Sequence, residues 1–572
     1  MQKTEKPQSD TIGNLLDELA ARYGEHEAVI WDNNRLNYRS LKIQADVFAM
    51  SLLAFGIKPG DHIALLSSNR TEWLIAAFAI AKVGGVTVAV STFSTERELA
   101  WILNHSRANC VITVSSVRKQ NFIALLKKLC PEIEMSVPGL LDCSSLPYLK
   151  TIISIDDPSH GAVINWQDFI LRSTKVKPKE LSNRQKKVTK DDICYILYTS
   201  GSTAEPKGVM LAHGNVIANG FDIGERQNLH PGDRLWFSVP LFWSFGSANA
   251  LPAIITHGGC AVLQETFEPG EALNLIEKEQ CTVFYGMVNM VRAMREHPLW
   301  SPKKVKSMRT GLTIGLPEDI QMMIDTLGAK ELCNVYGSTE TYGNAAVCNS
   351  NDSLELRLQS QGLPLPGMRI RVIDIETRQP LAAGNLGELA VAGYVTPGYF
   401  RSPELTESSF DSEGYFLTGD LGIVGRDGRI YFKGRLKEMI KIGGINVSPL
   451  EVEEVLIQHP CIQQAFVFGL SDDIRDEKIV AVIEPKEGTK IDIDSLTAYC
   501  RKELAPYKVP AYFCEKSNED LPRTATGKIN KPELKRQLEK EHNDHKGRSD
   551  QIEVQVLNSS SPIPYETSSK EE

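Results

Sequence analysis

The chain lacks the features that define several large classes of protein. No stretch reaches the roughly 18 uninterrupted apolar residues that a membrane-spanning helix needs, and the nearest candidate, residues 73–90, is broken by Lys82 and by paired glycines. Residues 1–10 are polar and contain no apolar core of a secretory signal. Positive charge is not in excess either, because 63 Lys and Arg stand against 72 Asp and Glu, a formal net charge of −9. We therefore expect no transmembrane segment and no nucleic-acid partner.

The cysteines also lack the spacing of a metal or redox motif. Eleven are scattered along the chain without a C-x-x-C pair. Several, such as Cys194 and Cys281, lie in or beside apolar runs, where a free thiol is usually buried and reduced. The sequence therefore predicts a cytoplasmic protein with reduced cysteines, and neither a secreted disulfide scaffold nor a zinc site.

The length of 572 residues exceeds that of one ordinary domain. Strand-like and helix-like segments alternate through about residue 430, the pattern of a layered α/β fold, and residues 157–190 are polar enough to suggest a surface connection. Shorter elements follow. We predict an α/β fold with a large N-terminal domain over 1–434, a small mobile α+β C-terminal domain over 435–541, and a disordered tail over 542–572.

The segment T-S-G-S-T-A-E-P-K-G at residues 199–208 is the most informative part of the chain. Its glycines permit a tight turn, its hydroxyl and free N–H groups can converge on an anion, and its lysine supplies positive charge. It is not a Walker A loop, because Pro206 precedes the lysine and Gly208 follows it. A polar surface turn is the alternative. As a phosphate loop after a buried strand at 193–197, it would bind through Thr199, Ser200, Gly201, Ser202, Thr203 and Lys207.

Four further motifs follow in a fixed order. They are Y-G-S-T-E at 336–340, L-T-G-D at 417–420, G-R-L-K-E-M-I-K-I-G-G at 434–444 and P-R-T-A-T-G-K at 522–528. With the phosphate loop, they resemble the motifs of the adenylate-forming (ANL) superfamily, which contains acyl- and aryl-CoA ligases, adenylation domains of peptide synthetases and firefly-type luciferases. The resemblance extends from about residue 12 to residue 540.

The resemblance implies an enzyme that uses ATP to convert a carboxylic acid into acyl-AMP, releasing pyrophosphate, and then transfers the acyl group to coenzyme A. It implies that Thr339 binds the α-phosphate, that Glu340 holds Mg²⁺, and that Lys528 brings carboxylate and phosphate together. The nucleotide contacts that it further implies are Asn334, Tyr336, Gly337, Asp420 and Arg435. The charged residues of this set, taken singly, would be ordinary turn or surface residues; they are Glu340, Asp420, Arg435 and Lys528.

The second half of the reaction is implied by the hinge motif. Lys437 matches the pivot of the family, the pair Gly443 and Gly444 matches the lining of a pantetheine tunnel, and Lys441 resembles a lysine that reaches the adenylate in that state. A surface lysine is an equally good interpretation of Lys441. In the family, the small domain rotates between the two half-reactions.

The chain departs from the family pattern where the acid is expected to bind. The segment at 240–246 matches an aromatic gate, but Trp243 stands where many members have histidine. Nearby, Ile314-Gly315-Leu316-Pro317 replaces smaller residues, and residues 287–289 lack the usual proline. We predict that the acid contacts Trp243, Ser247, Gly315 and Leu316.

The sequence leaves three matters open. The acid is unspecified, and so is the oligomeric state. A separate acyl or peptidyl carrier protein is an alternative to CoA as acceptor, since both present phosphopantetheine. A luciferase-like oxygenase and a non-catalytic nucleotide-binding scaffold are the alternatives from other classes, and the complete set of Lys207, Glu340, Asp420 and Lys528 argues against the scaffold.

Overall fold

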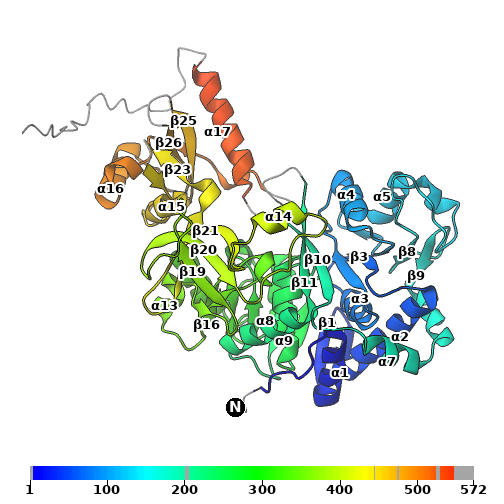
Figure 1. Ribbon diagram of the computed structural model, residues 1–572. Coiled ribbons are helices and arrows are strands. Elements are labelled where there is room, and N and C mark those ends of the chain that lie inside the picture. The colour runs from blue at the N-terminus through cyan, green and yellow to red at the C-terminus, as the bar shows by residue number, and fades with distance from the viewer. Residues whose placement is uncertain (1–3, 200–204, 443–444, 473–475, 524–528, 547–572) are drawn as a thin grey trace, which may run out of the picture. The chain divides into compact units, whose positions relative to one another are not determined.

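The computed structural model describes residues 4–199, 205–442, 445–472, 476–523 and 529–546 (Figure 1). The chain separates into two compact units. The first comprises Met1–Thr418 and Gly422–Phe432, and the second comprises Gly419–Leu421 and Lys433–Glu572. The predicted α/β class, with a large N-terminal and a smaller C-terminal part, is confirmed. The domain limits at 434 and 541 stay a prediction.

Two sheets form the framework of the first unit. The nine-stranded sheet has the order β18-β17-β16-β15-β14-β12-β13-β1-β2, and the seven-stranded sheet has the order β11-β10-β4-β3-β5-β8-β9. The strands of the first sheet are β1 (Glu27–Trp31), β2 (Asn34–Asn37), β12 (Arg234–Phe237), β13 (Cys260–Leu263), β14 (Val283–Tyr285), β15 (Thr310–Thr313), β16 (Glu331–Tyr336), β17 (Ala346–Val347) and β18 (Leu363–Pro364). Those of the second are β3 (His62–Leu66), β4 (Val86–Ala89), β5 (Cys110–Thr113), β8 (Thr151–Ser154), β9 (Val163–Asn165), β10 (Ile193–Thr199) and β11 (Lys207–Ala212).

Helices cover both faces of each sheet, so alternate side chains along a strand are buried in different cores. In β3, Ile63 and Leu65 join the central core, whereas Leu66 joins a separate core on the outer face. In β12, Phe237 faces the central core and Trp236 faces a third one. The central helices are α1 (Ile12–Tyr23), α2 (Tyr38–Phe55), α3 (Thr71–Lys82), α8 (His213–Arg226) and α9 (Leu251–Thr256), of which α8 and α9 lie between the sheets in Figure 1. The outer helices are α4 (Glu96–Ser106), α5 (Phe122–Leu129), α10 (Pro269–Glu279), α11 (Val288–Glu296) and α12 (Pro317–Leu327).

The expectation that residues 157–190 form only a surface connection is wrong. This segment contains β9, which pairs in parallel with β8, and the helices α6 (Trp166–Ile170) and α7 (Pro178–Gln185). Ile164, Trp166 and Phe169 are buried in the central core. The few apolar residues in a polar stretch carry the packing, and a strand of three residues gives too short a pattern to be recognised from sequence.

A further sheet has four strands in the order β19-β20-β21-β22. Its strands are β19 (Arg369–Ile373), β20 (Leu386–Ala392), β21 (Phe416–Val424) and β22 (Ile430–Arg435), and the short helices α13 (Leu354–Gln359) and α14 (Pro403–Ser408) lie nearby in the chain.

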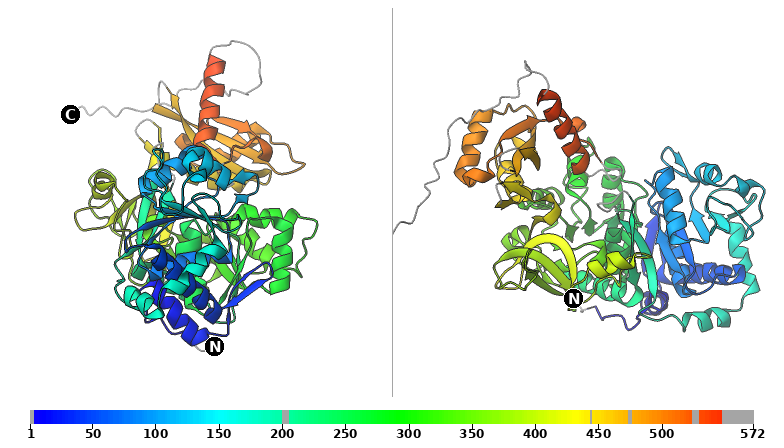
Figure 2. Two further views of the ribbon diagram at one scale, coloured as in Figure 1. Left: turned by 90° about the vertical axis from the view of Figure 1, so that its right-hand side faces the viewer. Right: turned by 45° about the horizontal axis from the view of Figure 1, so that its top comes forward.

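The second unit has its own sheet and its own cores. Its strands are β23 (Ile440–Ile442), β24 (Ile445–Val447), β25 (Ile462–Asp472), β26 (Asp476–Pro485) and β27 (Tyr512–Glu515). The helices α15 (Pro449–Ile457) and α16 (Ile493–Glu503) pack on one face, and α17 (Lys531–Lys546) packs on the other through Leu534 and Leu538 (Figure 2). Residues 542–546 of the expected tail therefore belong to α17, and the rest of that tail lies outside the described residues.

No helix in the described part of the chain combines the length and apolarity needed to cross a membrane. All eleven cysteines are free thiols, and only Cys461 and Cys514 are partly exposed. This agrees with the expectation of buried reduced cysteines.

Candidate active site

The nine-stranded sheet gathers several predicted segments at one edge. β12, β14, β15 and β16 run parallel as neighbours, so their carboxyl ends lie at the same edge of the sheet. The gate segment 240–246 follows β12, Gly315 and Leu316 follow β15, and the segment 337–340 follows β16. Ligands of open α/β sheets bind outside the carboxyl ends of the strands. The fold thus brings the expected gate, acyl and magnesium segments to one place.

The expected phosphate loop connects two paired strands. Thr199 ends β10, Lys207 begins β11, and the two residues are direct partners in this antiparallel pair. The ammonium of Lys207 lies 5.7 Å from the centre of the Tyr399 ring, a cation–π distance. Ser200, Gly201, Ser202 and Thr203 lie outside the described residues.

Tyr399 connects the lysine to the expected metal ligand. Two backbone hydrogen bonds place it beside β11, one from Phe400 N–H to the carbonyl of Gly208 (2.8 Å) and one from Met210 N–H to the carbonyl of Gly398 (3.2 Å). The Tyr399 hydroxyl donates to Oε1 of Glu340 at 2.8 Å.

Burial and the adjacent carboxylate both raise the pKa of Tyr399 above its ordinary value, so the hydroxyl keeps the proton that it donates. The hydroxyl therefore remains a donor to Glu340 at neutral pH and well above it. Tyr399 was not predicted as a site residue, because nothing in the sequence around it signals a partner 59 residues away.

Thr339 lies beside the gate. It opens a short 3₁₀ helix, Thr339–Thr341, and its hydroxyl is 2.9 Å from the hydroxyl of Ser244. The adjacent Glu340 is held through its main chain as well, because its carbonyl accepts a hydrogen bond from Thr396 N–H at 2.7 Å. Thr396 in turn donates from its hydroxyl to the carbonyl of Met210 in β11. Side chains and backbone together fix Thr339 and Glu340 against β11 and the gate.

The gate segment has unusual backbone geometry. Phe245–Ala250 is a π-helix, a rare form that is frequently found at functional sites. A Cβ at Gly246 would collide with the carbonyl oxygen of Pro240, so this turn requires glycine. Trp243 is partly buried, stands edge-on to Phe242 with ring centres 6.0 Å apart, and accepts hydrogen bonds at its carbonyl from the N–H and hydroxyl of Ser247.

Ser247 opens onto a small apolar cavity of about 20 Å³ in the central helical layer. Besides Ser247 and Tyr195, the cavity is lined by apolar residues, Ile12, Leu15, Ala77, Phe78, Val216, Ile217, Leu251, Pro252 and Ile255. Nothing charged faces it, so it suits a hydrocarbon better than a polar acid. A chain of several carbons exceeds its volume, so the side chains around it must move to admit one. The predicted contacts Gly315 and Leu316 are half-buried in the turn before α12.

Three predicted nucleotide contacts come from β16 and the turn after it. Tyr336 stacks with Phe432 at 6.0 Å between ring centres. Asn334 is buried, and its side chain donates to the carbonyl of Ser360 (3.2 Å) and accepts from Val335 N–H (2.9 Å). A Cβ at Gly337 would collide with the backbone of residues 343 and 344. The structure thus shows packing reasons for Asn334 and Gly337, and their nucleotide contacts stay predictions.

The remaining predicted residues belong to the second unit. Nε of Arg435 lies 3.2 Å from Oδ1 of the buried Asp420, and the arginine itself is exposed. Lys437 and Lys441 are exposed as well, and the backbone N–H of Lys441 donates to Oε2 of Glu477 at 2.7 Å. The other three, Gly443, Gly444 and Lys528, lie outside the described residues.

The chain is similar to known proteins over most of its length. The profile of the AMP-binding enzyme family matches residues 16–400, and the profile of the AMP-binding enzyme C-terminal domain matches residues 451–528. The putative acyl-CoA synthetase YngI of Bacillus subtilis (strain 168) is 34% identical over 531 residues, which cover 92% of this chain and 96% of that protein. The mitochondrial medium-chain acyl-CoA ligase ACSF2 of Danio rerio is 32% identical over 543 residues, or 93% of this chain and 89% of its own.

Solved structures agree with these matches. The anthranilate CoA ligase AuaEII in complex with anthranoyl-AMP matches with a TM-score of 0.80 at 25% identity. The match covers 95% of this chain and 100% of AuaEII. ATP-bound MatB from Rhodopseudomonas palustris has a TM-score of 0.76 at 24% identity over 92% of this chain and 99% of its own, a likeness of fold.

Proposed function

The chain belongs to the AMP-binding enzyme family, and within that family we propose an AMP-forming acid–CoA ligase whose acid is a medium-chain fatty acid. It activates the acid with ATP as acyl-AMP, releases pyrophosphate and passes the acyl group to CoA. The observation that carries this proposal is the row of contacts from Lys207 through Tyr399 to Glu340, which ends beside the gate at Thr339 and Ser244.

Acyl-AMP formation brings several anions together, so the site must supply positive charge and oriented donors. We assign the charge at the phosphate loop to Lys207, and the hydrogen bond to the α-phosphate to the Thr339 hydroxyl. Glu340 and Thr339 present hard oxygen ligands, which fit Mg²⁺. When bound, that ion neutralises phosphate charge. Tyr399 orients the Glu340 carboxylate by donating to one oxygen, which leaves the other oxygen for the metal.

Two observations support a medium-chain acid. Relatives at 30–32% identity over nearly the whole chain are named medium-chain acyl-CoA ligases. The cavity at Ser247 is apolar and lies deep in the central helical layer, where a hydrocarbon chain is stabilised by about 25 cal/mol for each Å² that it removes from water. We propose that Trp243 controls the access of the acid to this cavity.

We take CoA as the acceptor because the relatives are named for it. We also propose a cytosolic location, since all the cysteines are free and most are buried.

The substrate experiment measures AMP formation with short-, medium- and long-chain saturated acids and with an aryl acid. Each acid is tested without acceptor, with CoA, and with a carrier protein bearing phosphopantetheine. We expect CoA-dependent AMP formation that is fastest with the medium-chain acids. Turnover with the carrier protein and not with CoA would show that the acceptor is the carrier protein. Fastest turnover with the aryl acid would show that the substrate is not a fatty acid.

Trp243→Ala tests the gate in the same assay. Removing the indole should change the order of preference among the acids and leave the KM for ATP nearly unchanged, because the indole lies on the acyl side. Trp300→Ala is the matched control, since Trp300 is also partly buried but packs in the outer core beyond the nine-stranded sheet. If Trp243→Ala lowers the melting temperature and leaves the acid ranking intact, Trp243 is a core residue and not the gate.

A further inference from the structure

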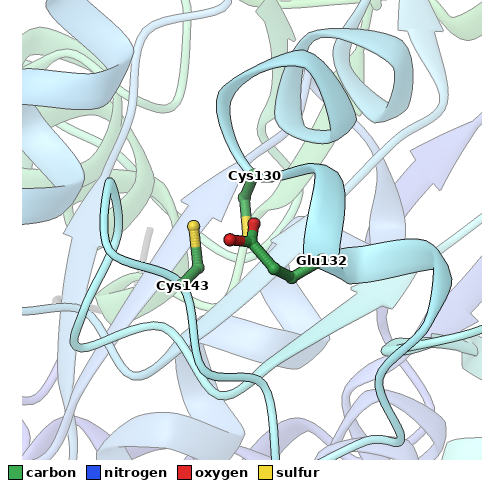
Figure 3. A group of neighbouring side chains, drawn as sticks. All are labelled: Cys130, Glu132 and Cys143. Atoms are coloured by element: carbon green, nitrogen blue, oxygen red, sulfur yellow. The ribbon is translucent and has the colours of Figure 1, made fainter.

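Two thiols and a carboxylate converge in the first unit, apart from all the residues assigned above. Cys130 directly follows α5, Glu132 lies in the following 3₁₀ helix Pro131–Glu134, and Cys143 lies in the irregular segment before β8. One ligand atom from each residue lies within 4.8 Å of the other two. Figure 3 shows the Glu132 carboxylate beside the Cys130 sulfur, with the Cys143 sulfur facing both.

The two sulfurs are shielded from water, whereas the carboxylate is not. Cys130 is 0% exposed and Cys143 is 2% exposed, and both belong to the outer core of the seven-stranded sheet, with Ile133 and Leu141 as neighbours. Glu132 is exposed. The carboxylate therefore lies on the solvent side of the cluster, and the two sulfurs lie behind it.

The backbone on either side holds the three groups in place. Cys130 N–H donates to the carbonyl of Leu126 (2.9 Å), and the Cys130 carbonyl accepts from Ile133 N–H (3.2 Å). On the other side, Leu141 N–H donates to the carbonyl of Lys150 at 3.3 Å. These bonds anchor both cysteine segments, so the ligands are brought together by the fold before any ion binds.

The two acidic residues of this 3₁₀ helix differ in their partners. Glu134 forms an ion pair with Lys127 at 2.5 Å. Glu132 forms no ion pair with any cation in the described ranges of the chain, and the thiols of Cys143 and Cys130 are its side-chain hydrogen-bond partners. The Glu132 carboxylate therefore lies beside two buried thiols, and a divalent ion can bind all three groups at once.

We propose that Cys130, Cys143 and Glu132 bind a Zn²⁺ ion. Thiolate ligands favour zinc over magnesium and calcium, which prefer oxygen. Three protein ligands leave one tetrahedral position for water. Binding forms two Zn–S bonds and one Zn–O bond and releases the two thiol protons to solvent, with no change of oxidation state. The ion joins the end of α5 to the irregular segment at 135–150.

The experiment uses the reduced full-length chain. It is incubated with Zn²⁺ in the presence of excess Mg²⁺, freed of unbound metal and analysed for metal content. We expect one zinc ion per chain. With Co²⁺ as a spectroscopic probe we expect a thiolate-to-cobalt charge-transfer band, which should be absent from the double variant Cys130→Ser, Cys143→Ser.

A matched pair of surface variants keeps the test independent of folding. Glu132→Gln should weaken zinc affinity by at least roughly tenfold, the smallest cost of losing even an outer partner of a metal site. Glu134→Gln, two residues away and exposed, should bind zinc like the unaltered chain. A second readout is limited proteolysis at 135–150, which zinc should slow in the unaltered chain and in Glu134→Gln only.

Three results would overturn the proposal. One is a chain that retains no zinc under these conditions, and another is equal zinc affinity in Glu132→Gln and Glu134→Gln. The third is a Cys130–Cys143 disulfide in freshly purified protein. Ligase turnover enters none of these readouts, so failure of the zinc site and failure of the proposed enzyme function are separable.

Discussion

At the scale of single residues, the contacts of Tyr399 decide how the candidate site is built. The motifs predicted Lys207 and Glu340 as site residues. They are 133 positions apart in the sequence, and a third residue connects their side chains. Tyr399 is that residue, with its ring facing the lysine and its hydroxyl bonded to the carboxylate. Phenol chemistry suits this role, since the ring attracts a cation and the hydroxyl donates to an anion.

Tyr399→Phe tests this role directly. Removing the hydroxyl keeps the ring but takes one donor from Glu340. A hydrogen bond to a charged group contributes about 1.5–3 kcal/mol, so we expect kcat/KM for Mg-ATP in pyrophosphate release to fall by roughly 10- to 100-fold. Because the pKa of Tyr399 is raised above its ordinary value, the hydroxyl stays protonated. The loss should therefore be the same at about pH 7 and about pH 9.

Tyr394→Phe is the control, since Tyr394 lies in the same segment but has no bond to Glu340. Equal activity of Tyr399→Phe and the unaltered enzyme, at low as well as saturating Mg²⁺, would assign Tyr399 to packing alone.

At the scale of single elements, helix α8 contains a buried carboxyl group whose ionisation destabilises the folded state. Asp222 is 5% exposed and lies among the buried residues of this central helix. Among the described residues, its Oδ2 atom has no hydrogen-bond partner. Burial raises the pKa of Asp222 to about 6, while Lys6 and Arg226 lower it and Glu225 adds to the rise. The folded state therefore disfavours the charged carboxylate.

The sign of the pH effect follows from this shift. Above pH 3.8, the ordinary value, the unfolded chain loses this proton while the folded chain keeps it until about pH 6. Stability falls as pH rises through that window. Asp222→Asn removes the penalty, so it should raise the free energy of unfolding by roughly 1–3 kcal/mol at about pH 8 and by nearly nothing at about pH 4.

Urea unfolding at these two pH values measures the difference. Asp325→Asn, an exposed carboxylate of α12, is the control and should show no such pH-dependent gain. The same gain for Asp222→Asn at both pH values would show that the carboxylate is not the cause.

At the scale of the whole molecule, the chain is built as two units with separate cores. The second unit has a sheet of its own with helices on both faces, and it buries two apolar clusters of its own. The family resemblance assigns different half-reactions to different parts of the second unit, with Lys528 in acyl-AMP formation and Gly444 in thioester formation.

Substituting Lys528 by alanine should therefore impair one half-reaction and spare the other. We expect acyl-AMP formation to fall by about 100-fold or more, the usual cost of losing a group that stabilises developing charge. Thioester formation from supplied acyl-AMP should stay largely intact. Lys540→Ala, an exposed lysine of α17, should leave both steps unchanged.

Gly444→Leu is the complementary variant. It should spare pyrophosphate release and block thioester formation, because a side chain would fill the expected pantetheine tunnel. Equal loss of both steps in Lys528→Ala, or full ligase turnover in Gly444→Leu, would contradict this division.

The sequence alone determined the local structure and the chemistry of its motifs. Apolar runs such as residues 193–197 became strands, and the amphipathic run at 38–55 became α2 with those bounds, because hydrophobic period and strand length act over a few neighbouring residues. The order of the motifs was enough to predict the family, since each motif is a contiguous stretch whose residue types suit phosphate, ribose or metal.

Only the tertiary structure decided which distant residues meet. It brought Tyr399 to Lys207 and Glu340, and Ser244 to Thr339. It also recruited Val163–Asn165 as an edge strand and joined Cys130, Glu132 and Cys143 in one cluster. Such meetings depend on the packing of whole sheets and helices. Tyr399, Val163–Asn165 and Cys143 lie in no motif, and no pattern within a few residues of them encodes their partners.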